Sequence, residues 1–385
     1  MTEMDERLRN DLERIKYFHS QAQHPPEAAW YGLDRPLKRM LDIPDIMPVL
    51  VQMHHSIDCY LHTPPCYTSH KGALLVGTKY YQKIYVERYG KPTYATGSPY
   101  VHYRRMNGIE ILPDAKGTLA FPAHSTHHIY SNYDVDRFAD QLLALPESFQ
   151  PVGVCLYWMD MLNGKLDPFL KRNIPVYTAG HIFDPDFHVR FYDILRRYRY
   201  STANAAIGSH IVLALEMGLP YFRMGGRYTM EDVTGGDPNW PGGVQTEDAF
   251  SSWGAAEIER LTFDLKPHQT AADITISPEL AARVSETHGC DGPIDADLTR
   301  KIIFYAFLKR HPWGQQLEKL MTSQPGILTR AVYEALFAHD PAGLEVMRFI
   351  ERYPAVLQPP TMDEVRAVVA PHIDISMDKA NAWRT

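Results

Sequence analysis

The chain has few cysteines, and their spacing fits neither a zinc ribbon nor a redox pair. Only four occur in 385 residues, and no two are separated by the two residues of a Cys-x-x-Cys motif. Cys155 falls inside an apolar run at residues 152–158, as a structural thiol would. We therefore predict four reduced thiols and no disulfide framework, at Cys59, Cys66, Cys155 and Cys290.

Long apolar runs and long basic runs are also missing. No stretch approaches the roughly 20 apolar residues of a membrane span, and residues 1–15 are strongly charged. We expect a cytoplasmic protein; peripheral association with a membrane stays open. With 39 basic and 46 acidic residues, the net charge of −7 argues against nucleic acid as the main partner.

The composition is that of a globular protein, with 45% hydrophobic and 22% charged residues. A chain of this length exceeds the size at which one hydrophobic core usually keeps growing, which favours at least two domains. We place an α/β domain at residues 1–112 and a more regular domain at residues 113–260. A mostly helical region at residues 261–385 would pack on both.

Strands and helices alternate regularly in the middle of the chain. The strand segments are apolar throughout instead of alternating, which is typical of a parallel sheet covered on both faces. Right-handed crossovers would then give a doubly wound, Rossmann-like sheet. The expected strands are 118–121, 152–157, 174–178, 199–202 and 220–224, and the expected helices between them are 134–145, 166–172, 187–198 and 208–217.

The segment after this regular unit is rich in Gly, Pro and Trp and runs from residue 225 to about residue 254. It is too long for an ordinary connection, so we interpret it as a lid or as an irregular packing segment. Helical patterns then dominate. They predict helices at residues 297–309, 314–322, 327–338, 343–351 and 362–369.

Polar residues follow the expected strands directly. In open parallel sheets, ligands lie beyond the carboxyl ends of the strands, so these positions are candidates for a binding site. The candidates are His124, Ser125 and Thr126 after the first strand, Tyr157 after the second, and Gly180 and His181 after the third, with Ser201 and Asn204 where the fourth strand ends.

Gly208 and Ser209 stand where the fourth of these strands leads into a helix. Exposed backbone N–H groups at a helix N-terminus favour a phosphate, and glycine allows close approach of a ligand. The alternative is simple helix capping by Ser209.

Three histidines, His124, His127 and His128, lie within five residues. Their imidazoles are suited to phosphate oxygens or to a leaving group, although surface histidines without a role are the alternative. A zinc site would need a third or fourth ligand that the spacing does not supply. We therefore predict no metal and no cofactor.

A general base is expected in the first domain. The apolar run at residues 48–53 predicts a strand that ends at His54 and His55, with Asp58 close behind. A histidine with a pKa near neutrality is suited to taking a proton from an acceptor hydroxyl. Asp160 and Asp184 are further candidates, and strand-end histidines bonded only to backbone are the alternative.

Residues 117–126, 154–160 and 201–218 resemble glycosyltransferases of the two-domain GT-B architecture from bacterial surface-polysaccharide loci. The resemblance covers the middle of the chain. It implies two Rossmann-like domains, a nucleotide-sugar donor bound by the domain at residues 113–260, and metal-independent transfer to a glycan or lipid-linked acceptor on the side of residues 1–112. Position by position, it places His124, Ser125, Gly208 and Ser209 at donor phosphates, with Ala179, Gly180 and His181 near base or ribose.

The Ser/Thr-x-Asn and Gly-Ser elements are also similar to phosphate-contacting segments of some bacterial sialyltransferases. The donor would then be CMP-linked, with UDP- and GDP-linked sugars as alternatives. The chain departs from the GT-B pattern in lacking a clear acidic base motif and the usual glutamate at the donor ribose. A nucleotide-sugar epimerase or hydrolase, or a non-catalytic α/β protein of a polysaccharide assembly complex, remain alternative interpretations.

Overall fold

The protein is an α/β structure with parallel sheets, as the sequence predicts. None of the helices in the described part of the chain combines the length and apolar character that crossing a bilayer requires. The computed structural model describes residues 6–53, 73–79, 82, 85, 93–205, 207–224, 226–236, 242–246, 258–264, 271–288, 295–323, 340–361 and 364.

The chain divides into two compact units, each assembled from separate segments. Unit 1 comprises Met1–His24, Ser56–Cys66 and Tyr103–His288, and unit 2 comprises Pro25–His55, Tyr67–His102 and Gly289–Thr385. The segments of the two units therefore alternate along the chain. The boundaries expected from the sequence, after residues 112 and 260, instead follow the chain in order.

Unit 1 is built on a six-stranded sheet in which all neighbouring strands are parallel. Its spatial order is β12-β9-β8-β4-β6-β7. When the six strands are numbered 1 to 6 as they occur along the chain, the order from the β7 edge to the β12 edge is 3-2-1-4-5-6. The strands are β4 (Thr118–Phe121), β6 (Val152–Cys155), β7 (Val176–Tyr177), β8 (Tyr200–Ala203), β9 (Tyr221–Arg223) and β12 (Phe263–Asp264).

The strands form where the sequence is apolar for several residues in succession. All four residues of β4 and all four of β6 are buried, which is what coverage on both faces requires. The strands β4, β6, β7, β8 and β9 all begin and end within two residues of the predicted segments. The short strand β12 was not predicted.

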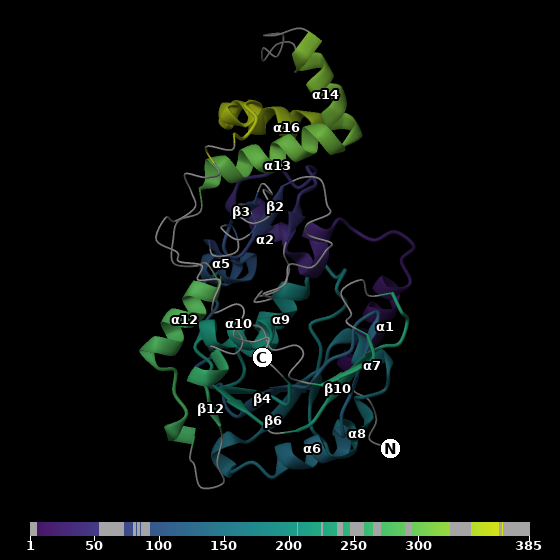
Figure 1. The fold of residues 1–385 in the computed structure, drawn as a ribbon, viewed down its shortest axis with the longest axis vertical. Helices are drawn as coiled ribbons and strands as arrows, with labels where there is room; N and C mark the ends of the chain where they lie inside the picture. Colours follow the sequence, from purple (N-terminus) through teal and green to yellow (C-terminus); the bar gives the residue numbers. More distant parts are fainter. Residues whose placement is uncertain are drawn as a thin grey trace. The chain divides into compact units, whose positions relative to one another are not determined.

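Helices cover both faces of this sheet. In Figure 1, α6 and α8 lie on one side of the strands, and α9 and α10 lie on the other. The side chain of Asp134 begins α6 by accepting a hydrogen bond from the backbone N–H of Arg137 at 2.9 Å. The helices of unit 1 are α1 (Glu6–His19), α6 (Val135–Leu143), α7 (Trp158–Leu162), α8 (Asp167–Lys171), α9 (Phe187–Leu195), α10 (Ser209–Met217) and α12 (Pro278–His288), with 3₁₀ turns at Glu147–Phe149 and Ala271–Asp273.

A backbone contact fixes where β4 begins. Gly117 precedes β4 with φ of +73°, and a Cβ there would lie 1.9 Å from the carbonyl oxygen of Pro151. Glycine removes both the steric penalty of positive φ and this clash. Because Pro151 immediately precedes β6, the contact holds the starts of two neighbouring strands together.

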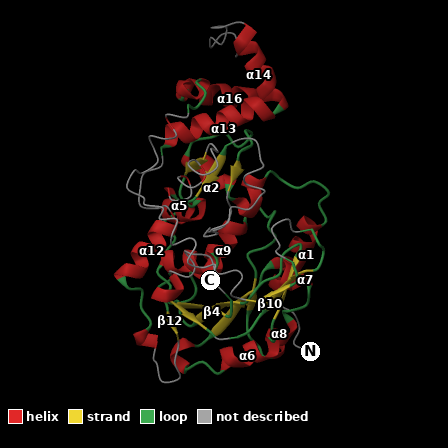
Figure 2. Cartoon of the chain, in the orientation of Figure 1, coloured by secondary structure: helices red, strands yellow, loops and turns green. Residues whose placement is uncertain are grey.

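A second, antiparallel sheet corrects the interpretation of residues 225–254. We expected no regular structure there, yet the segment contains two strands that pair with each other, and one of them, β10, also pairs with a strand from before α6 (Figure 2). The order is β11-β10-β5. These strands are exposed or half-buried along much of their length, so they lack the apolar runs that revealed the main sheet. They are β5 (Ile129–Asn132), β10 (Thr229–Asp232) and β11 (Val244–Thr246).

Unit 2 contains a three-stranded parallel sheet in the order β1-β2-β3. Leu74, Val76 and Tyr85 form a buried cluster on it. Of the helices predicted after residue 261, the three at residues 297–309, 314–322 and 343–351 are confirmed, and the other two lie mostly or wholly outside the described residues. The elements are β1 (Gln52–Met53), β2 (Leu74–Val76), β3 (Thr93–Ala95), α2 (Asp34–Met40), α13 (Ala296–Arg310), α14 (Pro312–Ser323) and α16 (Pro341–Arg352), with 3₁₀ turns at Glu27–Gly32 and Pro354–Leu357; α5 (Pro99–Met106) contains the boundary at Tyr103.

Candidate functional site

The carboxyl edge of the six-stranded sheet gathers most of the candidate residues. Because its strands are parallel, the segments after β4, β6, β7 and β8 all leave from this one edge. Nine predicted positions lie in these segments: His124, Ser125, Thr126, Tyr157, Gly180, His181, Asn204, Gly208 and Ser209. The tenth, Ser201, is the second residue of β8 and not a strand end, because strand pairing continues to Ala203. The predicted bases His54, His55 and Asp58 lie outside the described residues.

The direction of strand addition reverses between β4 and β8. From β4 the chain adds β6 and β7 on one side, and from β8 it adds β9 and β12 on the other. The segments after β4 and β8 meet here directly, because the backbone N–H of Ala123 donates to Asn204 Oδ1 at 2.7 Å. Such a reversal point is where open α/β sheets bind ligands.

Three of the predicted residues are buried and bonded within the protein. Asn204 makes the bond to Ala123, and the Ser201 hydroxyl lies 3.5 Å from the carbonyl oxygen of Pro220. Ser125 Oγ accepts from the backbone N–H of Ser131 at 3.1 Å. Their side chains therefore shape the edge of the sheet. Direct contacts of these residues with a ligand stay a prediction.

A buried ion pair supports the segment after β4. Lys165 Nζ lies 2.8 Å from Asp160 Oδ1, and both side chains are less than a tenth exposed. Asp160 Oδ2 accepts from the backbone N–H of Ser125, and Lys165 donates to Ser125 Oγ at 3.2 Å and to the carbonyl oxygen of Ser131. A carboxylate held this way is anchored by a cation, so Asp160 is better suited to support than to proton transfer.

Two half-buried imidazoles face the reversal point. The ring of His124 lies 4.6 Å from that of Tyr157, and the ring of His210 lies 4.9 Å from that of Phe121. His124 Nδ1 and His210 Nε2 are enclosed and find no hydrogen-bond partner in the described part of the chain. Sequence reasoning missed His210, although it follows Ser209 directly at the start of α10.

Burial keeps both rings uncharged. It lowers the pKa of His124, against the opposing attraction of Asp160, and it lowers the pKa of His210 to about 3, with repulsion from His124 adding to the effect. Neutral imidazoles offer one donor and one acceptor each. The unpartnered nitrogens can therefore hydrogen-bond a polar ligand at this edge.

We expect His210→Phe to reduce the acid sensitivity of the fold. Between about pH 3, the folded pKa, and pH 6.5, its ordinary value, unfolded His210 carries a proton that the folded side chain lacks. Its contribution to stability is thus complete above pH 6.5 and is lost as the pH falls. At pH 5 the loss relative to pH 7 is about 1 to 2 kcal/mol.

Urea unfolding at pH 7 and pH 5 measures this effect. The Phe variant should lose less stability than the wild type over that interval, and His128→Phe, at an exposed histidine, should behave as the wild type does. An equal loss in the wild type and in His210→Phe would show that His210 is not the group responsible.

A second group of histidines lies farther along the same edge. His19 ends α1, His127 lies between β4 and β5, and His181 follows β7. One ring nitrogen from each lies within 4.8 Å of the others. Trp158 packs on the group, with its ring 4.2 Å from His181 and 4.7 Å from His127. His19 carried no signal in the sequence, because it ends a helix more than 100 residues away.

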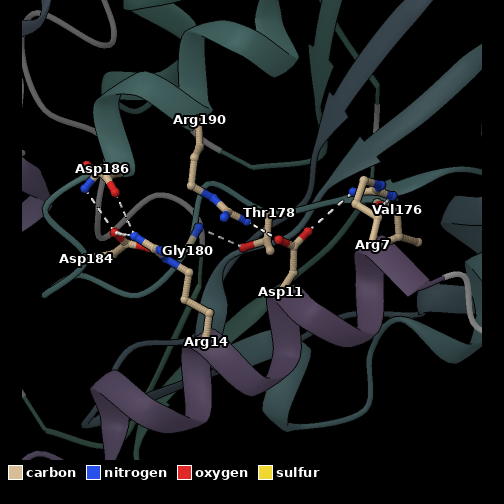
Figure 3. A network of polar contacts seen from close by, with 9 residues as sticks. All are labelled: Arg7, Asp11, Arg14, Val176, Thr178, Gly180, Asp184, Asp186 and Arg190. Atoms are coloured by element: carbon tan, nitrogen blue, oxygen red, sulfur yellow. Dashed lines mark hydrogen bonds and ion pairs between the residues drawn. The ribbon is translucent and has the colours of Figure 1, made fainter.

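Ion pairs fasten α1 beside the segment after β7 (Figure 3). Arg14 Nε and Nη2 lie 2.5 and 2.7 Å from the two carboxylate oxygens of Asp184, which is fully buried. Asp11 forms an ion pair with Arg190 of α9 through one carboxylate oxygen, and Arg7 donates to the carbonyl oxygen of Val176 at 2.7 Å. These contacts place the end of α1, and with it His19, next to His181.

Gly180 allows that segment to turn back on itself. Its φ is +108°, and a Cβ would lie 2.8 Å from Asp184 Oδ2. The Gly180 N–H donates to Thr178 Oγ1, and the Asp184 N–H donates to the carbonyl oxygen of His181. Gly180 therefore lets the backbone pass close to the Asp184 carboxylate. The sequence carried no sign of this structural role; a place for Gly180 near the base or ribose of a donor stays a prediction.

Comparison with protein-family models gives no match, and comparison with curated protein sequences gives none either.

Proposed function

We propose that the chain is a glycosyltransferase that moves a sugar from a nucleotide-sugar donor to a glycan or lipid-linked acceptor in surface-polysaccharide synthesis. The observation that carries the proposal is the reversal of strand order between β4 and β8. The order 3-2-1-4-5-6 is that of doubly wound sheets that bind nucleotides at this point. Unit 1 would be the Rossmann-like donor domain.

The residues at the reversal point fit the phosphates of such a donor. Gly208 and Ser209 begin α10, and the helix dipole favours an anion at this end. His124 comes from the neighbouring segment and offers an unpartnered nitrogen. The same stretches, residues 117–126 and 201–218, carry the sequence resemblance to GT-B enzymes, so fold and sequence favour the same donor position.

Nucleotide binding tests the proposal. We expect one of CMP, UDP, GDP, dTDP and ADP to raise the melting temperature of the full chain, since a ligand at 100 times its Kd stabilises by about 2.7 kcal/mol. Ser209→Trp should abolish the shift by filling the start of α10. Ser148→Trp is the matched control, because Ser148 is exposed in the turn that precedes β6, at the opposite edge of the same sheet.

Each outcome has a distinct meaning. A shift in the wild type and in Ser148→Trp, but not in Ser209→Trp, supports the donor site and names the nucleotide. No shift with any nucleotide contradicts the proposal and favours the non-catalytic assembly protein. Transfer itself is measured as incorporation of labelled sugar from the matching donor into glycan or lipid; conversion of the donor without incorporation favours the epimerase or hydrolase.

A further inference from the structure

We propose that His19, His127 and His181 bind one divalent transition-metal ion of the zinc type. The three side chains come from three separate segments, yet one nitrogen of each lies within 4.8 Å of the other two. Three imidazoles with an open fourth position form a known zinc ligand set. Spacing along the sequence supplies no third or fourth ligand next to His127, but in the fold α1 and the segment after β7 bring His19 and His181 to it.

The spacing of the nitrogens suits this ion after a small movement. Zinc–nitrogen bonds of about 2.0 to 2.1 Å in a tetrahedral site put ligand nitrogens about 3.4 Å apart. The side chains must therefore close by about 1.4 Å at most. His19 is exposed at the end of its helix and His127 is half-buried, so both can move without disturbing the core.

His181 is the fixed member of the group. It is fully buried, and its Nδ1 accepts from the backbone N–H of Phe183 at 3.1 Å, which places the proton of the neutral ring on Nε2. That Nε2 is enclosed and has no hydrogen-bond partner among the described residues. Coordination through Nε2 moves the proton to Nδ1, which then can no longer accept from the Phe183 N–H. The metal–nitrogen bond must offset the loss of this hydrogen bond and a small rotation of the ring away from that donor.

The hydrogen bonding of His181 favours a cation over an anion. Its Nδ1 accepts from the backbone N–H of Phe183, so the ring carries a single proton and is neutral. Neutral imidazole is the form that ligates metals.

The backbone segments that carry His19 and His181 are fixed relative to each other without a metal. The Arg14–Asp184 ion pair ties α1, which carries His19, to the segment that carries His181. Trp158 packs against His127 and His181 and limits access of water on one side. The proposal rests on these contacts and is independent of the proposed glycosyltransferase function, although a metal here would revise the expected metal independence.

Cobalt(II) provides the test, because its visible absorption reports the number and geometry of its ligands. We expect the full chain, made without a polyhistidine tag and stripped with a chelator, to bind one Co²⁺ with a tetrahedral-type band that Zn²⁺ abolishes. His19→Gln and His127→Gln should each weaken binding by more than about 100-fold, the upper end of what outer-shell changes cost.

His128→Gln is the matched control. His128 adjoins His127 but is exposed, and its Nδ1 lies 2.7 Å from Thr234 Oγ1. The control should bind Co²⁺ as the wild type does, and circular dichroism should show all variants folded. A wild type without the cobalt band, or a band of equal affinity in both ligand variants, overturns the proposal.

Discussion

Lys165→Met should destabilise unit 1 by about 3 to 5 kcal/mol, the usual cost of removing one partner from a buried ion pair. Asp160 is 1% exposed and would be left in the interior without its cationic partner. The lysine also donates to Ser125 Oγ and to the carbonyl oxygen of Ser131, and both acceptors are buried. Methionine keeps most of the side-chain length, so the loss comes from the charge and the hydrogen bonds.

The double variant Asp160→Asn, Lys165→Met separates charge from packing. Asparagine keeps an oxygen that can accept from the backbone N–H of Ser125, while both charges disappear. We expect the double variant to be more stable than Lys165→Met alone, because replacing a buried pair costs much less than breaking it. Urea unfolding followed by far-ultraviolet circular dichroism measures all three proteins. A double variant that is less stable than Lys165→Met would refute the proposed role of the buried charge.

The parallel sheet of unit 1 was predictable because burial on both faces leaves a direct mark in the sequence. β4 matches the predicted segment 118–121 residue for residue, and all four of its residues are buried. The antiparallel sheet left no such mark. In β5, buried and exposed residues alternate over only four positions, and β11 has no buried residue. The pairing of β5 with β10 depends on contacts across about 100 residues of chain, which local patterns do not encode.

The candidate site was predictable to the extent that it follows from strand ends. A polar residue directly after a buried strand is readable from the sequence, as with His124 and His181. Which of these side chains face a ligand depends on tertiary contacts: Ser125 turned out to bond to the Lys165 ammonium group. His19 reaches the site through the docking of α1, and that docking depends on ion pairs such as Arg14–Asp184, whose residues lie 170 positions apart.

Arg14→Met should destabilise unit 1 by about 3 kcal/mol, the lower end of the cost of breaking a buried ion pair. Asp184 is fully buried and would keep a hydrogen bond from the backbone N–H of Asp186 at 2.9 Å. The side chain of Arg14 is 37% exposed, so water offsets part of the loss. Lys16→Met is the matched control on the same helix: its pair with Glu13 is exposed at both ends and contributes at most about 1 kcal/mol.

Arg14→Met should also weaken metal binding by His19, His127 and His181, because Arg14 holds the helix that ends at His19. If α1 is fastened mainly by this pair, Arg14→Met should weaken Co²⁺ binding while leaving all three imidazoles in the chain, and Lys16→Met should not. Urea unfolding gives the stability and cobalt titration gives the affinity. Unchanged stability in Arg14→Met would mean that Asp184 finds another partner, and unchanged cobalt affinity would mean that α1 is held by Asp11–Arg190 and Arg7 instead.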